Sequence, residues 1–549
     1  MRGEGQGEGR FWRRAARHES LTPTLSRHAG RGSNAPPVTT VPAAFAASVA
    51  LHGERLAVVE ESGASISYRD LDRQRRLAAS ALLAHGLQRG DRVAIWSPNR
   101  LEWIVAGLAA HSIGAALVPI NTRMKGAEAG DILARSDARL LVCAGRFLDT
   151  DYPALLAPHR PTRLETVVVL DDTGWAAFLS RAESVSEATL HQAEAAVDGT
   201  ELMDVMFTSG TTGRPKGVMT TQAQNLRTIA AWSAAVGLVP EDRYLIVNPF
   251  FHAFGYKVGW LGGLLAGLTV LPHAVFDAKA VLRRIARDRI SVLPGPPTLF
   301  VSLLDDPERA TTDLSSLRAT ITGAAAIAPS LIERIRAELG FRLVLTGYGL
   351  TETCGVVSLC EGGDDAQTIA LTSGKAVAGV EMRCVDADNR PVAAGAPGEI
   401  VVRGYNVMQG YLDDPKATAE TIDADGWLHT GDVGVLDERG YIRITDRIKD
   451  LYITGGFNCY PAEIERLMAA HPAIAQSAVV GVADERLGEV GKAYVVLRPG
   501  ATLDDKALIA WCRENMANYK VPRSVAFVDA LPVNPSGKVL KYQLRNQER

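Results

Sequence analysis

Short apolar runs alternate with longer amphipathic stretches from residue 41 onward. The stretch SYRDLDRQRRLAASALLAHGL (67–87) repeats its apolar residues at the three- and four-residue spacing of a helix. RVAIWS (92–97) and AALVPIN (115–121) are short and apolar enough for buried strands. Alternation of this kind predicts an α/β fold in which helices cover sheets of largely parallel strands.

The pattern changes near residue 446. Beyond it, Pro461 stands where a proline opens a helix. TLDDKALIAWCREN (502–515) predicts a further helix, with Thr502 and Asp505 spaced like a capping box. Strands are expected at SAVVGV (477–482) and KAYVVL (492–497).

The length of 549 residues exceeds what one hydrophobic core usually serves. We expect a large N-terminal α/β domain of layered sheets and helices over 38–446, and a small mobile α+β domain over 447–549. Residues 1–37 differ from both, with seven arginines, three glutamates and no continuous apolar run. We expect a disordered tail or a non-native extension from a misassigned start, with an Arg-rich transit peptide as the alternative.

Composition narrows the class of protein. With 47% apolar residues, 22% charged residues and a net charge of -3, the chain resembles an ordinary globular protein without a basic field for nucleic acid. Its six cysteines form no CxxC pair, which argues against a zinc site or a disulfide framework and favours the cytoplasm. The longest apolar run, 258–271, contains four glycines and is short for a bilayer, so we expect buried helix and strand and no membrane span.

The stretch TSGTTGRPKG (208–217) follows the expected strand DVMF (204–207). Backbone N–H groups of a glycine-rich turn converge on anions, and the hydroxyls of Ser and Thr add donors, so phosphate is the natural ligand. The pattern of the P-loop NTPases is absent, because a proline, Pro215, precedes Lys216 and no Ser or Thr follows it directly. A phosphotransferase is therefore disfavoured.

Four further motifs follow in order: YGLTET (348–353), GWLHTGD (426–432), DRIKDLYITGGFNCYPAEIE (446–465) and PSGKVLK (535–541). With the glycine-rich stretch they resemble the adenylate-forming enzymes, which include acyl-CoA synthetases, luciferases and nonribosomal peptide adenylation domains. The resemblance covers roughly residues 40 to 549. It implies a two-step acid–thiol ligase, in which ATP and Mg²⁺ convert a carboxylic acid to an acyl-adenylate and CoA then displaces AMP.

The resemblance also implies nucleotide-binding residues. Glu352 and Thr208 would hold Mg²⁺, Tyr348 would lie against the adenine, and Asp432 and Arg447 would bind the ribose. Read alone, each is an ordinary exposed, paired or core residue, and the motif favours the functional interpretation. The remaining ATP-binding residues implied are Ser209, Gly210, Thr211, Thr212, Gly213, Lys216, Ala324, Gly349 and Thr351.

In the small domain, Lys538 matches the lysine that stabilises negative charge between the carboxylate and the α-phosphate. Lys449 matches the hinge about which that domain rotates between the two steps. Gly455 and Gly456 match the strip along the CoA tunnel, although a plain β-turn explains them equally well. Lys541 and Asp446 depart from the residues more common at those positions and touch none of the implied chemistry.

The acid side of the site is expected in NPFFHAFGYK (248–257). Peptide adenylation domains carry an aspartate in this segment, and none is present here. His252 stands there instead, as in acyl- and aryl-CoA synthetases, where it lies near the substrate carboxylate; a packed core histidine is the alternative reading. Because the sequence ends shortly after Lys538, we expect free CoA rather than a fused carrier domain as the thiol.

Within the acyl-CoA synthetases, several stretches resemble the bacterial ligases for a bicyclic indane propionate from steroid ring breakdown, with fatty acid ligases close behind. They are DRVAIWSPN (91–99), FFHAFGYK (250–257), VLPGPPT (292–298) and RLGEVGKAYVV (486–496). Such stretches follow lineage better than substrate. A non-catalytic adenylate-binding protein, an enzyme that acylates a carrier protein and a luciferase-like oxygenase are the alternatives, and whether copies form a homo-oligomer is open.

Overall fold

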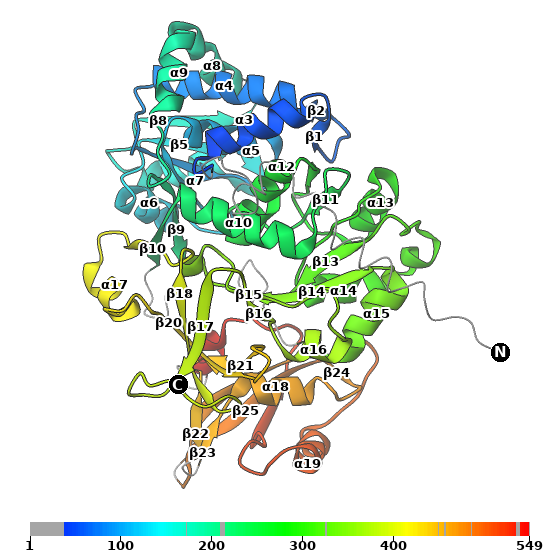
Figure 1. Ribbon diagram of the computed structural model, residues 1–549. Helices are drawn as coiled ribbons and strands as arrows, with labels where there is room; N and C mark the ends of the chain where they lie inside the picture. The colour runs from blue at the N-terminus through cyan, green and yellow to red at the C-terminus, as the bar shows by residue number, and fades with distance from the viewer. Residues whose placement is uncertain are drawn as a thin grey trace, which may run out of the picture.

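The computed structural model describes residues 38–171, 173–208, 215–323, 327–447, 450–454, 457–484, 486–533 and 539–547. The predicted fold class is confirmed: layered sheets and helices form a large body, and a small α+β domain lies below it, in orange and red in Figure 1. The expectation for residues 1–37 lies outside the described residues.

The sheet that leads to the glycine-rich stretch has the strand order β19-β10-β9-β4-β3-β5-β8. Neighbours from β9 to β8 are parallel, as predicted. At the other edge β10 is antiparallel to β9, and β19 to β10, so the sheet is largely but not wholly parallel. The physical reason is that the chain returns directly beside β9, whereas a parallel neighbour needs a long crossover. The bounds are β3 (Arg92–Trp96), β4 (Ala116–Pro119), β5 (Leu140–Ala144), β8 (Thr166–Leu170), β9 (Leu202–Thr208), β10 (Lys216–Thr221) and β19 (Gly410–Tyr411).

Two further sheets, in the orders β11-β12-β1-β2 and β13-β14-β15-β16, carry the acid-side segment and the YGLTET motif. Single bridges from Val292 to Tyr244 and to Ala319 link them. The strands are β1 (Leu56–Val59), β2 (Ser65–Ser67), β11 (Arg243–Ile246), β12 (Thr269–Pro272), β13 (Ala319–Thr322), β14 (Leu343–Tyr348), β15 (Ser358–Leu359) and β16 (Lys375–Ala376). The short hairpin of β6 (Arg146–Phe147) and β7 (Thr150–Asp151) stands apart from both.

The core of the large body is rich in aromatic side chains. The rings of Phe250 and Trp260 each lie 5.7 Å from that of Trp103, and Tyr256 stacks on Trp260 at 5.3 Å. Trp260 and Tyr256 come from the apolar run and the residues before it, which fold as predicted into buried helical turns, η3 (Tyr256–Leu261) and α12 (Gly262–Ala266), and the strand β12. The core therefore lies directly beneath the segment that contains His252.

Helices cover both faces of these sheets (Figure 1). They are α3 (Val41–His52), α4 (Tyr68–Ala84), α5 (Leu101–Ser112), α6 (Gly126–Arg135), α7 (Tyr152–Leu156), α8 (Gly174–Ser180), α9 (Glu187–Ala195), α10 (Gln222–Val236), α11 (Ala253–Gly255), α13 (Ala278–Asp288), α14 (Pro297–Asp305), α15 (Pro329–Leu339) and α16 (Ala366–Leu371). Among the described residues, no helix has the length and hydropathy that a bilayer crossing requires.

An antiparallel sheet, β17-β18-β20-β21, links the body to the small domain. It is built from β17 (Val380–Val385), β18 (Pro397–Gly404), β20 (Leu428–Leu436) and β21 (Ile442–Arg447), with α17 (Pro415–Thr421) beside it. The small domain pairs β23-β22-β25-β24, with β26 parallel to β25. Its elements are β22 (Tyr452–Thr454), β23 (Phe457–Cys459), α18 (Pro461–Met468), β24 (Ile474–Asp484), β25 (Gly488–Leu497), α19 (Asp505–Asn515), β26 (Ser524–Phe527) and α20 (Lys541–Asn546).

Two predictions about helix starts have different outcomes. Pro461 does open α18, where its missing N–H costs nothing. The capping box of Thr502 and Asp505 is wrong, because α19 begins only at Asp505. The carboxylate of Asp504 accepts a 2.7 Å hydrogen bond from the backbone N–H of Ala507 and caps the helix instead.

Candidate active site

The turn that follows β14 is the centre of the candidate site. Tyr348 ends the strand, and the chain then folds back through Thr351–Thr353 to Cys354, which has a left-handed backbone with φ of 55°. A Cβ atom at Gly349 would lie 2.1 Å from the carbonyl oxygen of Gly355. Only glycine permits this close approach, so the YGLTET motif folds into a compact turn, which the Thr353 hydroxyl closes by bonding to the backbone of Leu350.

The residues predicted to bind the nucleoside include a tyrosine and an aspartate that are in contact, and we call this part of the site the nucleoside end. The hydroxyl of Tyr348 donates a 2.5 Å hydrogen bond to Oδ2 of Asp432. Asp432 is buried, with 4% of its surface exposed. Asp432 lies on β20 directly opposite Arg447 on β21. Three residues that were predicted from separate motifs are thus neighbours along one edge.

The phosphate end begins where β9 stops. Thr208, the last residue of β9, lies opposite Lys216, the first residue of β10, and its hydroxyl donates to the Lys216 carbonyl at 3.5 Å. The hairpin therefore holds the two ends of the glycine-rich stretch side by side. The ammonium of Lys216 lies 4.7 Å from the centre of the Tyr411 ring, a cation–π contact.

Tyr411 joins this end to the turn, and the sequence analysis did not identify it. Its hydroxyl donates a 3.0 Å hydrogen bond to Oε1 of Glu352, and β10 packs against the short helix that contains Glu352. Burial, together with the neighbouring Glu352 carboxylate, raises the pKa of the Tyr411 phenol, so the hydroxyl keeps its proton and remains a donor. A tyrosine after a glycine has no sequence signal that separates this role from ordinary packing.

The acid side meets the same turn. Nδ1 of His252 accepts a 3.2 Å hydrogen bond from the backbone N–H of Phe254, which leaves the ring proton on Nε2. Desolvation by the surrounding protein lowers the pKa of the imidazole, which favours the neutral ring. A Cβ atom at Gly355 would lie 3.3 Å from that of Ala253, so the His252 segment packs on the turn that holds Glu352.

The structure brings these predicted residues together, but the functional roles assigned to all of them stay predictions. Gly349 and Thr351 lie in the central turn, and their ATP-binding roles stay predictions. Outside the described residues lie Ser209, Gly210, Thr211, Thr212, Gly213, Ala324, Lys449, Gly455, Gly456 and Lys538.

The donor atoms at the phosphate end fit Mg²⁺. The carboxylate of Glu352 and the hydroxyl of Thr208 are hard oxygen ligands, and one carboxylate with phosphate oxygens is a common way for proteins to bind this ion. The contacts through Lys216 and Tyr411 connect these two residues. Bound there, the ion would neutralise charge on the pyrophosphate that leaves.

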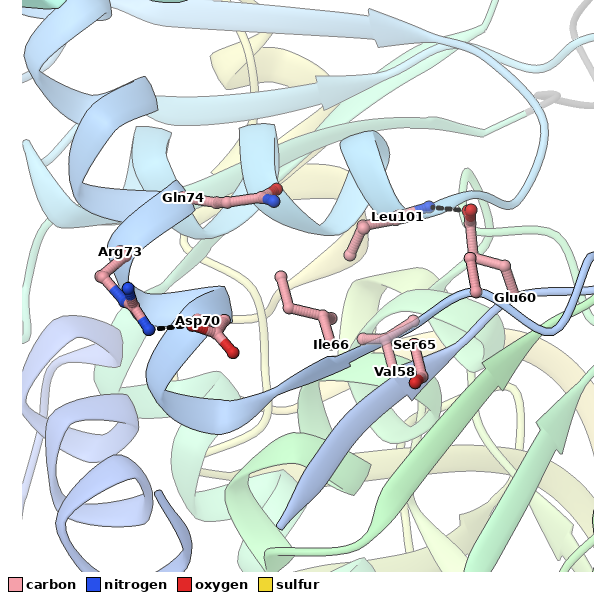
Figure 2. Close-up of a pocket in the computed structure, with 9 residues that line it drawn as sticks. Val58, Glu60, Ser65, Ile66, Asp70, Arg73, Gln74 and Leu101 are labelled. Carbon is pink, nitrogen blue, oxygen red and sulfur yellow. Dashed lines mark hydrogen bonds and ion pairs between the residues drawn. The ribbon is translucent and has the colours of Figure 1, made fainter. Parts of the chain in front are cut away.

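A pocket of about 430 Å³ lies elsewhere, between β1, β2 and the start of α4 and α5. Figure 2 shows Glu60 at one end of it, accepting a 3.0 Å hydrogen bond from the Leu101 backbone, and the ion pair of Arg73 with Asp70 at the other. None of its lining residues belongs to the motifs. It is separate from the candidate active site.

Two family models match the chain, the AMP-binding enzyme at residues 45–412 and the AMP-binding enzyme C-terminal domain at residues 463–538. The chain therefore belongs to the AMP-binding enzyme family, the adenylate-forming class that its motifs and folded site define. Its reaction is that of the acyl-CoA synthetases, which use ATP, Mg²⁺ and CoA, as predicted.

Two curated relatives have the name 3-[(3aS,4S,7aS)-7a-methyl-1,5-dioxo-octahydro-1H-inden-4-yl]propanoyl:CoA ligase. The one from Rhodococcus jostii is 50% identical over 522 residues, which cover 93% of this chain and 99% of the relative. The one from Mycobacterium tuberculosis is 51% identical over 472 residues, with 85% and 91% covered. Among solved structures, ATP-bound MatB from Rhodopseudomonas palustris matches with a TM-score of 0.81 and 31% identity over 92% of this chain and 98% of that one.

Proposed function

We propose that the chain joins a bicyclic, steroid-derived propionic acid to CoA. The observation that carries this proposal is the identity of 50% with a ligase named for such an acid, over nearly the full length of both chains. The surroundings of His252 support it. Phe254, whose backbone N–H bonds to this histidine, is only half-buried, and its flat apolar ring suits a rigid ring system.

The proposed chemistry has two balanced steps. A carboxylate oxygen of the acid attacks the α-phosphorus of ATP, and the bond to pyrophosphate breaks. The thiol of CoA then loses its proton to solvent, its sulfur attacks the acyl carbon, and AMP leaves with the electron pair of the anhydride bond. Carboxylates are poor acyl donors at neutral pH, so the mixed anhydride is what makes the second step favourable.

Each end of the candidate site serves the first step. Tyr348, Asp432 and Arg447 would orient the nucleoside, while Thr208, Lys216 and the glycine-rich stretch would bind the phosphates. Glu352 would hold Mg²⁺ beside the leaving pyrophosphate. Neutral His252 would donate from Nε2 toward the acid, and Lys538 would stabilise the charge that develops as the carboxylate attacks.

For the second step, we infer that residues 447–549 rotate about Lys449 and bring Gly455 and Gly456 to the CoA tunnel. β21 ends at Arg447 and β22 begins at Tyr452, so the proposed hinge falls in the short connection between two sheets. Few residues in such a connection absorb the change of backbone torsion. We also place the enzyme in the cytoplasm, which its six buried, free cysteines support.

The test is acid-dependent release of pyrophosphate with ATP and Mg²⁺, with and without CoA. The panel contains the bicyclic indane propionate, straight-chain acids of medium length and ferulate. We expect CoA-dependent turnover with the highest kcat/KM on the bicyclic acid. A maximum on straight-chain acids would make the enzyme a fatty acid ligase, and silence across the panel with ATP still bound would make it a non-catalytic adenylate binder.

A further inference from the structure

A buried ion pair lies behind the candidate site. The ammonium of Lys257 is 3.1 Å from the Asp204 carboxylate, and the two side chains are 1% and 0% exposed. The hydroxyl of Thr220 accepts from Lys257 at 3.0 Å and donates to Asp204 at 2.7 Å. It also accepts from the Asn225 amide at 2.9 Å, so its hydrogen-bonding capacity is filled.

The three polar partners come from the segments that build the site. Asp204 lies on β9, which ends at Thr208, and Thr220 lies on β10, which begins at Lys216. Lys257 follows His252 by one helical turn, and the backbone N–H of Tyr256 donates to the His252 carbonyl at 3.0 Å. A single ammonium thus binds both strands of the glycine-rich hairpin to the segment on the acid side.

The backbone around Lys257 departs from a regular helix. Residues Tyr256–Leu261 form a π-helical turn, and Gly259 interrupts it with φ of -78° and ψ of -107°. Widened turns of this kind cost helix stability and occur frequently at functional sites. Lys257 lies in this turn, and its ammonium contacts Asp204.

The turn that contains Glu352 reaches the same pair. Cys354, two residues after Glu352, is fully buried, and the charges of Lys257 and Asp204 both act on its thiol. Three segments, with Lys216, His252 and Glu352 as their proposed functional residues, therefore pack around one buried charge pair.

Stability alone does not account for this pair. Two charges that leave water lose solvation, and well-packed apolar residues in their place are often as stable or more stable. Burial raises the pKa of Asp204, and the Lys257 charge counteracts that rise only in part, so the pair carries a desolvation cost. An ion pair specifies a geometry where an apolar contact does not.

We propose that Lys257 is a positioning residue for the adenylation step, which sets the distance between the acid and the phosphates of ATP through Asp204 and Thr220. The inference rests on the proposed roles of His252 and the glycine-rich stretch. An error of about 1 Å in such a distance costs about 100-fold in rate, because attack requires aligned partners.

The decisive variant is Lys257→Met combined with Asp204→Leu, which removes both charges and leaves neither partner unpaired. The expected result is a folded protein that binds ATP with a dissociation constant within about threefold of wild type, while single-turnover pyrophosphate release at saturating ATP and acid falls about 100-fold. Thr220→Val, which removes only the bridging hydroxyl, gives a smaller loss of the same rate. The matched control is Arg75→Met, since Arg75 is also buried at 6% exposure but bonds to Asp72 and Glu194 among the helices of the large body.

A double variant that folds and retains the wild-type single-turnover rate would overturn the proposal. A loss of rate that saturating ATP restores would also overturn the proposal, because the ion pair would then affect only the binding of ATP by the hairpin of β9 and β10. The assay uses whichever acid the wild-type enzyme adenylates fastest. An error in the proposed substrate appears in the wild-type panel, whereas an error in this inference appears in the ratio of variant to wild type.

Discussion

The hydroxyl of Tyr348 donates a 2.5 Å hydrogen bond to Oδ2 of Asp432, across 84 positions of sequence. The bond fixes the carboxylate on β20 against the end of β14, so that its other oxygen is oriented by the fold rather than by the ligand. An acceptor that is oriented before binding loses less conformational freedom when the ribose hydroxyls arrive. We therefore expect Tyr348 to orient Asp432, in addition to its predicted contact with the adenine.

Tyr348→Phe is expected to raise the KM for ATP by about tenfold, because it removes a hydrogen bond to a charged group and keeps the ring. The kcat at saturating ATP should change little, since the reacting atoms are elsewhere. Initial-rate measurements over a range of ATP concentrations separate the two constants. A fall in kcat with an unchanged KM would contradict the orienting role.

Tyr411→Phe tests the link between Glu352 and Lys216. Loss of the partner that orients a metal ligand typically costs about 10- to 100-fold in metal affinity or activity. We expect kcat/KM for adenylation to fall by that factor, and half-maximal activity to require more Mg²⁺. The measurement is a Mg²⁺ titration of pyrophosphate release at fixed ATP.

The matched control is Tyr441→Phe. The Tyr441 hydroxyl donates to carboxylates at 2.7 Å and 3.2 Å in a part of the structure outside the candidate site. It should leave the Mg²⁺ dependence unchanged. A shift of equal size in both variants would mean that Tyr411 acts through general stability and not through Glu352.

The sequence assigned Tyr348 and Asp432 to one candidate site, and the structure brings the two side chains into contact, while their roles toward ATP stay predictions. Tyr348 and Asp432 could be predicted because each lies in a local motif, and the ends of neighbouring strands bring such motifs together. The antiparallel return of β10 could not, because the apolar pattern of a buried strand does not show the direction of its neighbour. Tyr411 lacked any distinguishing chemistry in the sequence.

The sequence contains a signal for the buried ion pair of Lys257 and Asp204. Asp204 is the lone charge in the strand LMDVMFT, and Lys257 adjoins the longest apolar run. Two opposite charges in apolar surroundings are costly apart, so each predicts a partner. The sequence does not reveal that Asp204 and Lys257 are each other's partner, because they are 53 positions apart and only the tertiary fold brings them together.

Acid should destabilise the fold through His111. Burial lowers the pKa of its imidazole to about 3, whereas the unfolded chain has a value of about 6.5. Between these values the unfolded state binds a proton that the folded state does not, so the stabilisation is complete above pH 6.5 and is lost as the pH falls toward 3. The free energy of unfolding should decline by about 1.4 kcal/mol per pH unit from this group.

Urea unfolding at pH 7, 6 and 5 measures that slope. In the His111→Gln variant the slope should be smaller than in wild type, whatever the change in stability at pH 7. The wild-type ring contacts the Tyr256 hydroxyl at 2.6 Å, and glutamine keeps a polar group there. An identical pH dependence in the two proteins would show that His111 is not the group responsible.

Lys538→Ala is expected to lower the rate of adenylation by about 10²- to 10³-fold, the typical cost of one preorganised donor to developing charge. The binding of ATP alone should change little. Stopped-flow detection of pyrophosphate gives the rate, and calorimetry gives the affinity. Lys506→Ala, which removes an exposed lysine from α19 of the same domain, is the control and should behave like wild type.

Lys449→Pro tests the proposed hinge by fixing one backbone torsion, since the proline ring holds φ near -65°. If the small domain must rotate between the two steps, a fixed torsion favours one orientation and slows the step that needs the other. We expect one half-reaction to fall more than about tenfold while its partner stays near wild type. Pyrophosphate release measures the first half-reaction, and conversion of a preformed acyl-adenylate to the thioester measures the second. Equal losses in both would indicate general damage, and two unimpaired steps would remove the hinge from Lys449.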